Sequence, residues 1–217
     1  MAWGIEPVAV TRFCEHPELP QVGGTKDPDL DAIVALTPDL VVMCREENRK
    51  QDADALVAAG RLLHVVDLDG VADHGPQLAA LAAAVGVPDR ALVLGDLAVE
   101  TRRRVFVPIW RRPWMTISGG TYGSSLLASI GFDNVFADAT DRYPESTLNE
   151  VGALAPDLVI APSEPYPFGP RHVAELERVA PAVLVDGQDL FWWGERAPAA
   201  QVRLAAALGR SGDVGAG

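Results

Sequence analysis

Residues 30–42 read LDAIVALTPDLVV and residues 148–160 read LNEVGALAPDLVI, so one pattern occurs twice at an offset of 118. Each copy has apolar residues three and four positions apart, which is typical of a short amphipathic helix. A proline then ends the helix, and a continuous apolar run follows that is typical of a buried parallel strand. Because a helix followed by a strand is half of a β-α-β unit, the repeat predicts two related α/β lobes with parallel sheets.

A second and weaker correspondence pairs residues 4–10 with residues 131–137 and predicts a further strand in each lobe. The C-terminal lobe also has an apolar run over 105–110 and a predicted helix over about 121–130. No counterpart of this strand and helix precedes residue 4. We therefore expect that a β-α unit of roughly 20 to 30 residues is missing from the N-terminal lobe.

The segment between the two copies has the signals of helices. Residues 77–85 are rich in Ala and Leu, and residues 89–104 begin after Pro88 and end in three arginines, which suits one long bridging helix. We expect an N-terminal lobe over 1–72, a helical connection over 73–104 that includes this bridging helix, a C-terminal lobe over 105–209 and a disordered tail over 210–217.

Composition excludes several classes of protein. The 217 residues are 48% hydrophobic, and 18 Lys and Arg stand against 30 Asp and Glu, a formal charge of -12. Such a chain repels phosphate backbones, so we expect no nucleic-acid partner. It has neither a signal-peptide pattern at its start nor an apolar run of the ~18 residues that span a bilayer. We expect a monomer without membrane insertion, cytoplasmic as written and extracytoplasmic if a signal peptide lies upstream.

Short motifs spread along the chain resemble those of one family. They are VGGTK at 22–26, PDLVV at 38–42, REEN at 45–48, WRRP at 110–113, NVFAD at 134–138, RYPE at 142–145, SEPYPF at 163–168, and DG at 186–187 with WGER at 193–196. The chain is similar to the helical-backbone metal receptors, or class III substrate-binding proteins, which serve importers of cobalamin, haem and siderophores. The resemblance implies two small α/β lobes joined by one long helix, with a ligand clamped in the cleft between them.

Aromatic and charged residues crowd the loops that follow the predicted strands, where open α/β sheets bind ligands. Aromatic faces suit a flat corrin or porphyrin, and arginine suits carboxylates or phosphate at its edge. The alternative is that the aromatics are lobe core and that the Arg–Glu pairs are structural. The candidate ligand contacts are Arg12, Arg45, Glu46, Asn48, Trp110, Arg111, Trp114, Arg142, Tyr143, Glu164, Tyr166, Phe168, Trp192, Trp193 and Arg196.

Glu46 and Glu164 are related by the offset of 118. In family members that dock onto a permease, one surface Glu of each lobe engages basic residues of the transporter. The resemblance therefore implies docking as a second role for these two acids, and ligand contact remains an alternative.

Other candidate sites have weaker patterns. Cys14, His16 and Cys44 match no standard zinc spacing, so we predict no metal site. Residues 118–121, SGGT, fit an anion site or a plain helix cap. We expect the remaining histidines, His64, His74 and His172, at the surface or at helix caps.

No nucleophile elbow, phosphate loop or metalloprotease motif occurs in the sequence, so we predict no enzyme and no required cofactor. The sequence predicts a protein that holds cobalamin, or a related metal chelate or tetrapyrrole, for an ABC importer with its permease as partner. The alternatives are a cytosolic enzyme or chelate-handling protein that uses the same cleft, and a curtailed paralogue that binds nothing.

Overall fold

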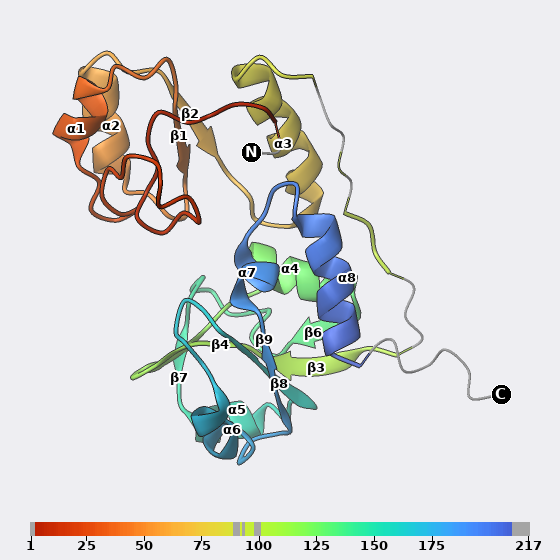
Figure 1. Ribbon diagram of the computed structural model, residues 1–217. Helices are drawn as coiled ribbons and strands as arrows, with labels where there is room; N and C mark the ends of the chain where they lie inside the picture. Colours follow the sequence, from red (N-terminus) through yellow and green to blue (C-terminus); the bar gives the residue numbers. More distant parts are fainter. Residues whose placement is uncertain (1–2, 89–91, 93, 98–100, 210–217) are drawn as a thin grey trace. The chain divides into compact units, whose positions relative to one another are not determined.

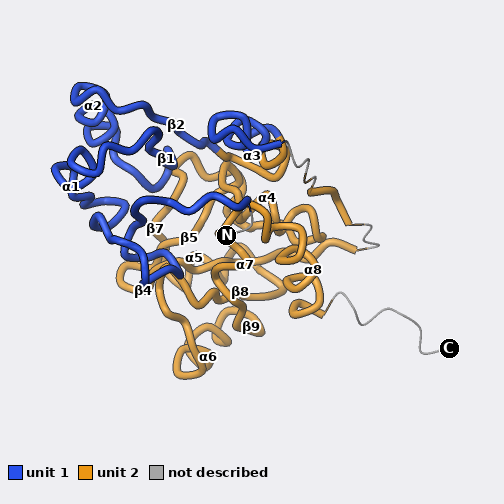
Figure 2. Tube along the Cα trace, turned by 45° about the horizontal axis from the view of Figure 1, so that its top comes forward, with its two compact units in different colours: residues 1–67, 76–91 blue, residues 68–75, 92–217 orange. Residues whose placement is uncertain are grey.

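The computed structural model describes residues 3–88, 92, 94–97 and 101–209, and the predicted tail over 210–217 lies outside the described residues (Figure 1). The chain forms two compact units (Figure 2). Unit 1 comprises residues 1–67 and 76–91, and unit 2 comprises residues 68–75 and 92–217. In the described part, none of the helices has the length and apolarity needed to span a membrane.

Unit 1 is built on two parallel strands. Its elements are α1 (Leu30–Ala35), β1 (Val41–Cys44), α2 (Lys50–Ala58), β2 (Leu63–Val66) and most of α3 (Val71–Ala84), within which the chain passes from unit 2 to unit 1. The pairing of β1 with β2 runs from Val41 opposite Leu63 to Cys44 opposite Val66. Met43, Leu56 and Val66 are buried in unit 1, as are Leu78 and Ala82 of α3.

Unit 2 has a four-stranded parallel sheet in the order β6-β3-β8-β9 and a small antiparallel sheet in the order β4-β5-β7. In Figure 1, α4, α7 and α8 lie on one face of the parallel sheet, and α5 and α6 lie on the other. Its elements are β3 (Arg103–Phe106), β4 (Pro108–Arg111), β5 (Trp114–Thr116), α4 (Tyr122–Ser129), β6 (Phe132–Asn134), β7 (Glu145–Ser146), α5 (Leu148–Ala153), β8 (Leu158–Pro162), α6 (Pro170–Leu176), β9 (Ala182–Val185), α7 (Gly187–Phe191) and α8 (Ala197–Ala207).

The structure confirms the repeat. In both copies the helix begins at the predicted leucine and a parallel strand follows, as α1 and β1 in unit 1 and as α5 and β8 in unit 2. The residues just after the two helices, Thr37 and Ala155, both take a left-handed backbone, with φ of 47° and 48°. Two α/β units with parallel sheets are therefore the architecture of this chain, as the sequence predicts.

The predicted bridging helix over 89–104 is wrong in the described part of that range. Leu92 and residues 94–97 have no regular secondary structure, and β3 begins at Arg103. The arginines do not end a helix, because Arg102 pairs with Asp133 and the Arg104 backbone N–H donates to Asp157. The long helix between the repeat copies is α3, whose first-turn Asp73 accepts from the N–H groups of Asp69 and Gly70.

Two further expectations need correction. Residues 4–10 form no strand, and only Val10 makes an isolated bridge, to Gln21. The apolar run over 105–110 is divided between two sheets, because the chain leaves β3 after Phe106 and enters β4 at Pro108. The helix predicted over about 121–130 is confirmed as α4, with the side chain of Thr121 capping its first turn.

Candidate functional site

In unit 1 hydrogen bonds join the motif at 22–26 to the motif at 45–48. Asn48 donates from Nδ2 to the carbonyl of Thr25, and its Oδ1 accepts from the N–H of Cys44. Lys26 Nζ donates to the carbonyl of Glu46 over 2.8 Å. Asn48 therefore braces the loop that leaves β1, and its polar atoms serve the backbone in this structure.

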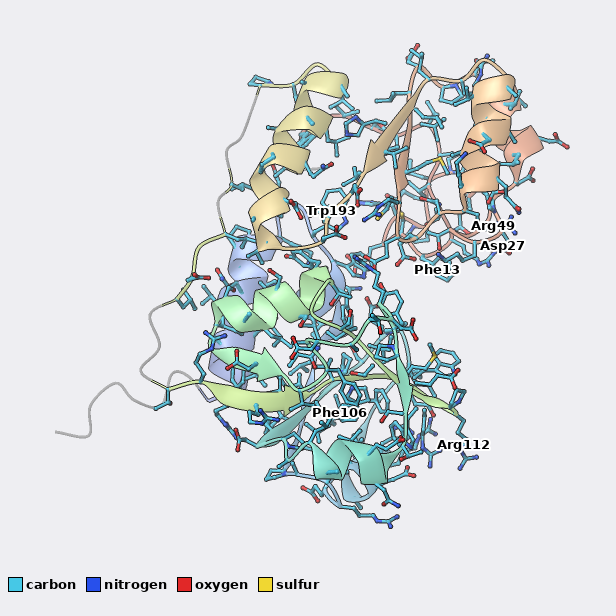
Figure 3. All side chains as sticks on the ribbon, turned by 180° about the vertical axis from the view of Figure 1, so that it is seen from behind. Phe13, Asp27, Arg49, Phe106, Arg112 and Trp193 are labelled. Atoms are coloured by element: carbon cyan, nitrogen blue, oxygen red, sulfur yellow. The ribbon has the colours of Figure 1, made fainter. Side chains whose placement is uncertain are left out.

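The two candidate arginines of unit 1 are in ion pairs. Arg12 donates to both carboxylate oxygens of Asp27, at 2.7 and 2.9 Å, on the side of unit 1 where Figure 3 labels Phe13 and Asp27. Arg45 contacts Asp67 over 2.5 Å. A Cβ added at Gly24 would lie 2.7 Å from Arg12 Nη2 and 2.5 Å from an Asp27 oxygen, so a larger residue there would push the ends of these two side chains aside.

In unit 2 four candidate aromatic residues form one cluster. Tyr166 contacts Trp110 edge-on at a centroid distance of 5.5 Å and Phe168 at 4.7 Å, and Phe168 stacks on Trp114. Phe168 is buried and belongs to the same core as Phe106, which Figure 3 places inside unit 2. Trp110 is 44% exposed. The cluster thus runs from the core at Phe168 to a solvent-facing ring at Trp110, so Phe168 is lobe core, and ligand contact stays a prediction for Trp110.

Arg111 and Arg142 are also paired with acids. Arg111 contacts Glu175 on α6 over 2.7 Å, and this hydrogen-bonded pairing raises the pKa of the guanidinium. Arg142 contacts Asp69, in the loop before α3, over 2.7 Å. Tyr143 follows Arg142 and is 36% exposed.

The last candidates gather around α7. Trp192 donates from Nε1 to Glu164, and the guanidinium of Arg196 lies over the Trp192 ring at 5.5 Å. Arg196 also contacts Asp189 over 3.1 Å. Asp189 is buried, and hydrogen bonds from Arg203 and Arg196 hold its pKa below the ordinary value. Trp193 follows in the same loop and is half-buried.

Glu164 is closely fitted into this cluster. A Cβ added at Gly187 would overlap Glu164 Cγ, and the N–H of Gly187 donates to the neighbouring Ser163 hydroxyl. Glu46, its counterpart in the repeat, is half-buried after β1. Ligand contact and transporter docking both stay predictions for this pair of acids.

The remaining motifs have structural explanations. Thr121 Oγ1 accepts from Ser124 N–H and donates to the Ser118 carbonyl, so the SGGT motif acts as a helix cap. His16 pairs with Glu18, and Cys14 and Cys44 are both free thiols. Across the described residues, no three His, Cys, Asp or Glu side chains are grouped as metal ligands.

Sequence reasoning missed several residues that organise these sites. The acids that pair with the arginines, Asp27, Asp67, Asp69, Glu175 and Asp189, have no common spacing from them. His74, expected at the surface or at a cap, is fully buried, and its ring nitrogens lie 3.2 and 2.8 Å from the carbonyls of Leu92 and Gly194. The cap expectation holds for His172, whose Nδ1 accepts from Gly169 N–H.

Comparison with known proteins finds relatives of this chain among single proteins, although no family model matches it. The vitamin B12-binding protein of Salmonella typhimurium is 30% identical over 175 residues, which is 73% of this chain and 66% of that protein. The chain thus spans about two thirds of the length of this relative.

Solved structures share the fold. The periplasmic vitamin B12-binding protein BtuF of Vibrio cholerae has a TM-score of 0.74 at 15% identity, over 95% of this chain and 89% of that one. The periplasmic haem-binding protein BhuT, in complex with two haems, has a TM-score of 0.76 at 19% identity, over 94% and 89%. These relatives are named as binding proteins. With its repeat, its two α/β units and these relatives, the chain belongs to the class III substrate-binding protein family of cobalamin, haem and siderophore receptors.

Proposed function

We propose that this protein binds cobalamin, or a related tetrapyrrole or metal chelate, and presents it to an ABC importer outside the cytoplasm. The support from comparison is that relatives are named for vitamin B12 and haem, and that the solved relatives are named periplasmic. In this proposal the protein binds the ligand and does not convert it. It requires no cofactor beyond the ligand itself.

The observation that carries the proposal is the exposed ring of Trp110. Trp110 stays 44% exposed although the same unit buries Phe106 and Phe168 in its core. Its contact with Tyr166 fixes the ring from one edge. A held aromatic ring offers apolar area to a flat macrocycle at a small entropic cost, which is how ligand sites gain contact area.

Titration of the purified chain with cyanocobalamin and with haemin, followed by ligand absorbance and thermal shift, tests the proposal. At a ligand concentration about 100 times the dissociation constant, binding adds about 2.7 kcal/mol of stability. We expect saturable binding of at least one ligand, weakened about tenfold or more in Trp110→Ala. Val202→Ala, at an apolar residue of α8 that is 61% exposed, is the matched control and leaves affinity unchanged.

The alternatives make different predictions in the same experiment. A chain that binds neither ligand fits the curtailed paralogue, and conversion of a bound ligand fits the enzyme or chelate-handling protein. Delivery to a permease is tested with the importer in a vesicle, where Glu46→Gln reduces uptake and not ligand affinity if this acid docks. A loss of ligand affinity in Glu46→Gln assigns it to ligand contact instead.

A further inference from the structure

The first turn of α3 contains a completely buried histidine, His74. Its Nε2 lies 2.8 Å from the carbonyl oxygen of Gly194, and its Nδ1 lies 3.2 Å from that of Leu92. A neutral imidazole has one N–H group, and the shorter distance assigns it to Nε2, which then donates to Gly194. All three residues belong to unit 2, so the contact lies within one compact unit.

Gly194 lies in the loop of residues 192–196, which joins α7 to α8. Its carbonyl also accepts from the N–H of Ala197 over 3.1 Å, at the start of α8. The hydrogen bond from His74 therefore joins this loop to α3, and Trp193 is labelled in Figure 3 beside that helix. The loop carries three of the candidate ligand contacts, which are Trp192, Trp193 and Arg196.

The first turn of α3 is itself held in place by unit 2. The N–H of Val71 donates to Oγ of Ser125 on α4 over 3.0 Å, and the carboxylate of Asp73 accepts from two backbone N–H groups just before the helix. A buried polar ring costs free energy unless it makes its hydrogen bonds. A leucine has a similar volume and no N–H group, so the specific contribution of His74 is to hold one backbone carbonyl of the loop.

We propose that His74 is a positioning residue of the ligand site. By holding the Gly194 carbonyl it fixes the loop 192–196, and with it the rings of Trp192 and Trp193, before the ligand arrives. A loop that is already ordered loses less conformational entropy on binding, which raises affinity. The inference rests on the proposed function, because it concerns the same site, and His74 acts through the loop because its own side chain is completely buried.

The test compares two substitutions of this histidine. His74→Leu keeps the approximate volume and removes the N–H group, whereas His74→Gln supplies a side-chain N–H in its place. Dissociation constants are measured with cyanocobalamin and with haemin. We expect His74→Leu to bind the ligand of the wild type at least fivefold more weakly, and His74→Gln to stay within twofold of the wild type.

The matched control is Leu158→Ala, at a buried position where β8 begins. It creates a cavity in the core of unit 2 and lowers the melting temperature. Because it removes no hydrogen bond of the loop, we expect it to leave the affinity unchanged.

A second readout needs no ligand. The N–H of Trp192 donates to the carbonyl of Gln188 over 3.0 Å, and the N–H of Ala197 donates to that of Gly194. We expect these two amides to exchange at least fivefold faster in His74→Leu than in the wild type, as measured by NMR, and to regain protection in His74→Gln. Loop amides exchange through local opening, so Leu158→Ala leaves their exchange unchanged.

The outcomes separate this inference from the proposed function. Unchanged affinity or unchanged loop exchange in His74→Leu overturns the inference and leaves the proposed function intact. A loss that His74→Gln does not restore, or that Leu158→Ala reproduces, overturns it as well, because the N–H group is then not the cause. Binding of neither ligand by the wild type overturns the proposed function, and the exchange of the loop amides still decides whether His74 orders the loop.

Discussion

Burial separates the two thiols of this chain. Cys14 is exposed, whereas Cys44, at the end of β1, is half-buried, and desolvation raises the pKa of its thiol. Because the thiolate is the nucleophile, a raised pKa slows alkylation. We predict that iodoacetamide at pH 8 modifies Cys14 at least tenfold faster than Cys44, as measured by peptide mass spectrometry over time. Equal rates in the folded chain would contradict this, and equal rates after denaturation are the control.

The sequence indicated which residues belong to the candidate site, but it did not indicate which residues they contact. Arg142 is visible in the sequence because it lies in a motif of polar and aromatic residues. Its acid, Asp69, lies 73 positions away and belongs to no pattern with it. Phe168 and Trp110 are both aromatic residues near the ends of predicted strands, so the sequence does not distinguish them. In the structure Phe168 lies in the core, whereas Trp110 is 44% exposed. Burial depends on which helix covers a loop, and local sequence does not contain that information.

A change of protonation at His172 should loosen α6. Its Nδ1 accepts from Gly169 N–H, which requires an unprotonated nitrogen, and burial together with the charges of Arg171 and Arg111 lowers its pKa below 6.5. The unfolded chain then takes up the proton first, so this contribution to stability is fully present above pH 6.5 and is lost as the pH falls from there through the lower pKa of the folded state. We predict an imidazole titration midpoint below 6.5 by NMR, and a smaller loss of melting temperature between pH 7 and 5 in His172→Gln. A midpoint above 6.5 would exclude this role.

Helix ends in the repeat carry a backbone strain that glycine would relieve. Ala155 has φ of 48° and is exposed, and left-handed backbone costs a non-glycine residue roughly 1–2 kcal/mol. Glycine loses about 0.5–1 kcal/mol in entropy, so Ala155→Gly should raise the free energy of unfolding in urea by about 0.5–1 kcal/mol. Ala153→Gly, two residues earlier in α5, is the matched control and should lower it by about 1 kcal/mol. Destabilisation by both substitutions would show that Ala155 is unstrained.

Helices and strands with a strong hydrophobic period were predictable from the sequence. The predicted bridging helix shows the limit of such predictions. Its start signal at Pro88 and its basic end are real features of the sequence. In the structure Arg102 pairs with Asp133, and Arg103 donates to the carbonyl of Asp157. The arginines take these places because Val105 and Phe106, which follow them, are completely buried as part of β3. Each helix-end charge contributes roughly 0.3–1 kcal/mol, which is less than the about 1.5–3 kcal/mol from burial of each of these two large apolar side chains.

The two repeat copies differ in how well the whole molecule encloses them. β8 pairs with β3 on one side and β9 on the other, whereas the ladders among the described residues give β1 only β2. Ile160 is fully buried, and its counterpart Val42 is 48% exposed. Local opening is easier where few apolar contacts and fewer strand neighbours oppose it.

Hydrogen exchange can compare these strands within one molecule. The segments 38–42 and 156–160, PDLVV and PDLVI, have nearly the same sequence, so their unprotected amides exchange at nearly the same rate and each segment is a control for the other. We predict that amides of β8 exchange at least tenfold more slowly than those of β1 in mass-spectrometric measurements at neutral pH. Equal protection would mean that β1 is enclosed as fully as β8, against the exposure of Val42. Slower exchange in β8 would show that unit 1 opens more easily than unit 2, as the single strand neighbour of β1 among the described residues predicts.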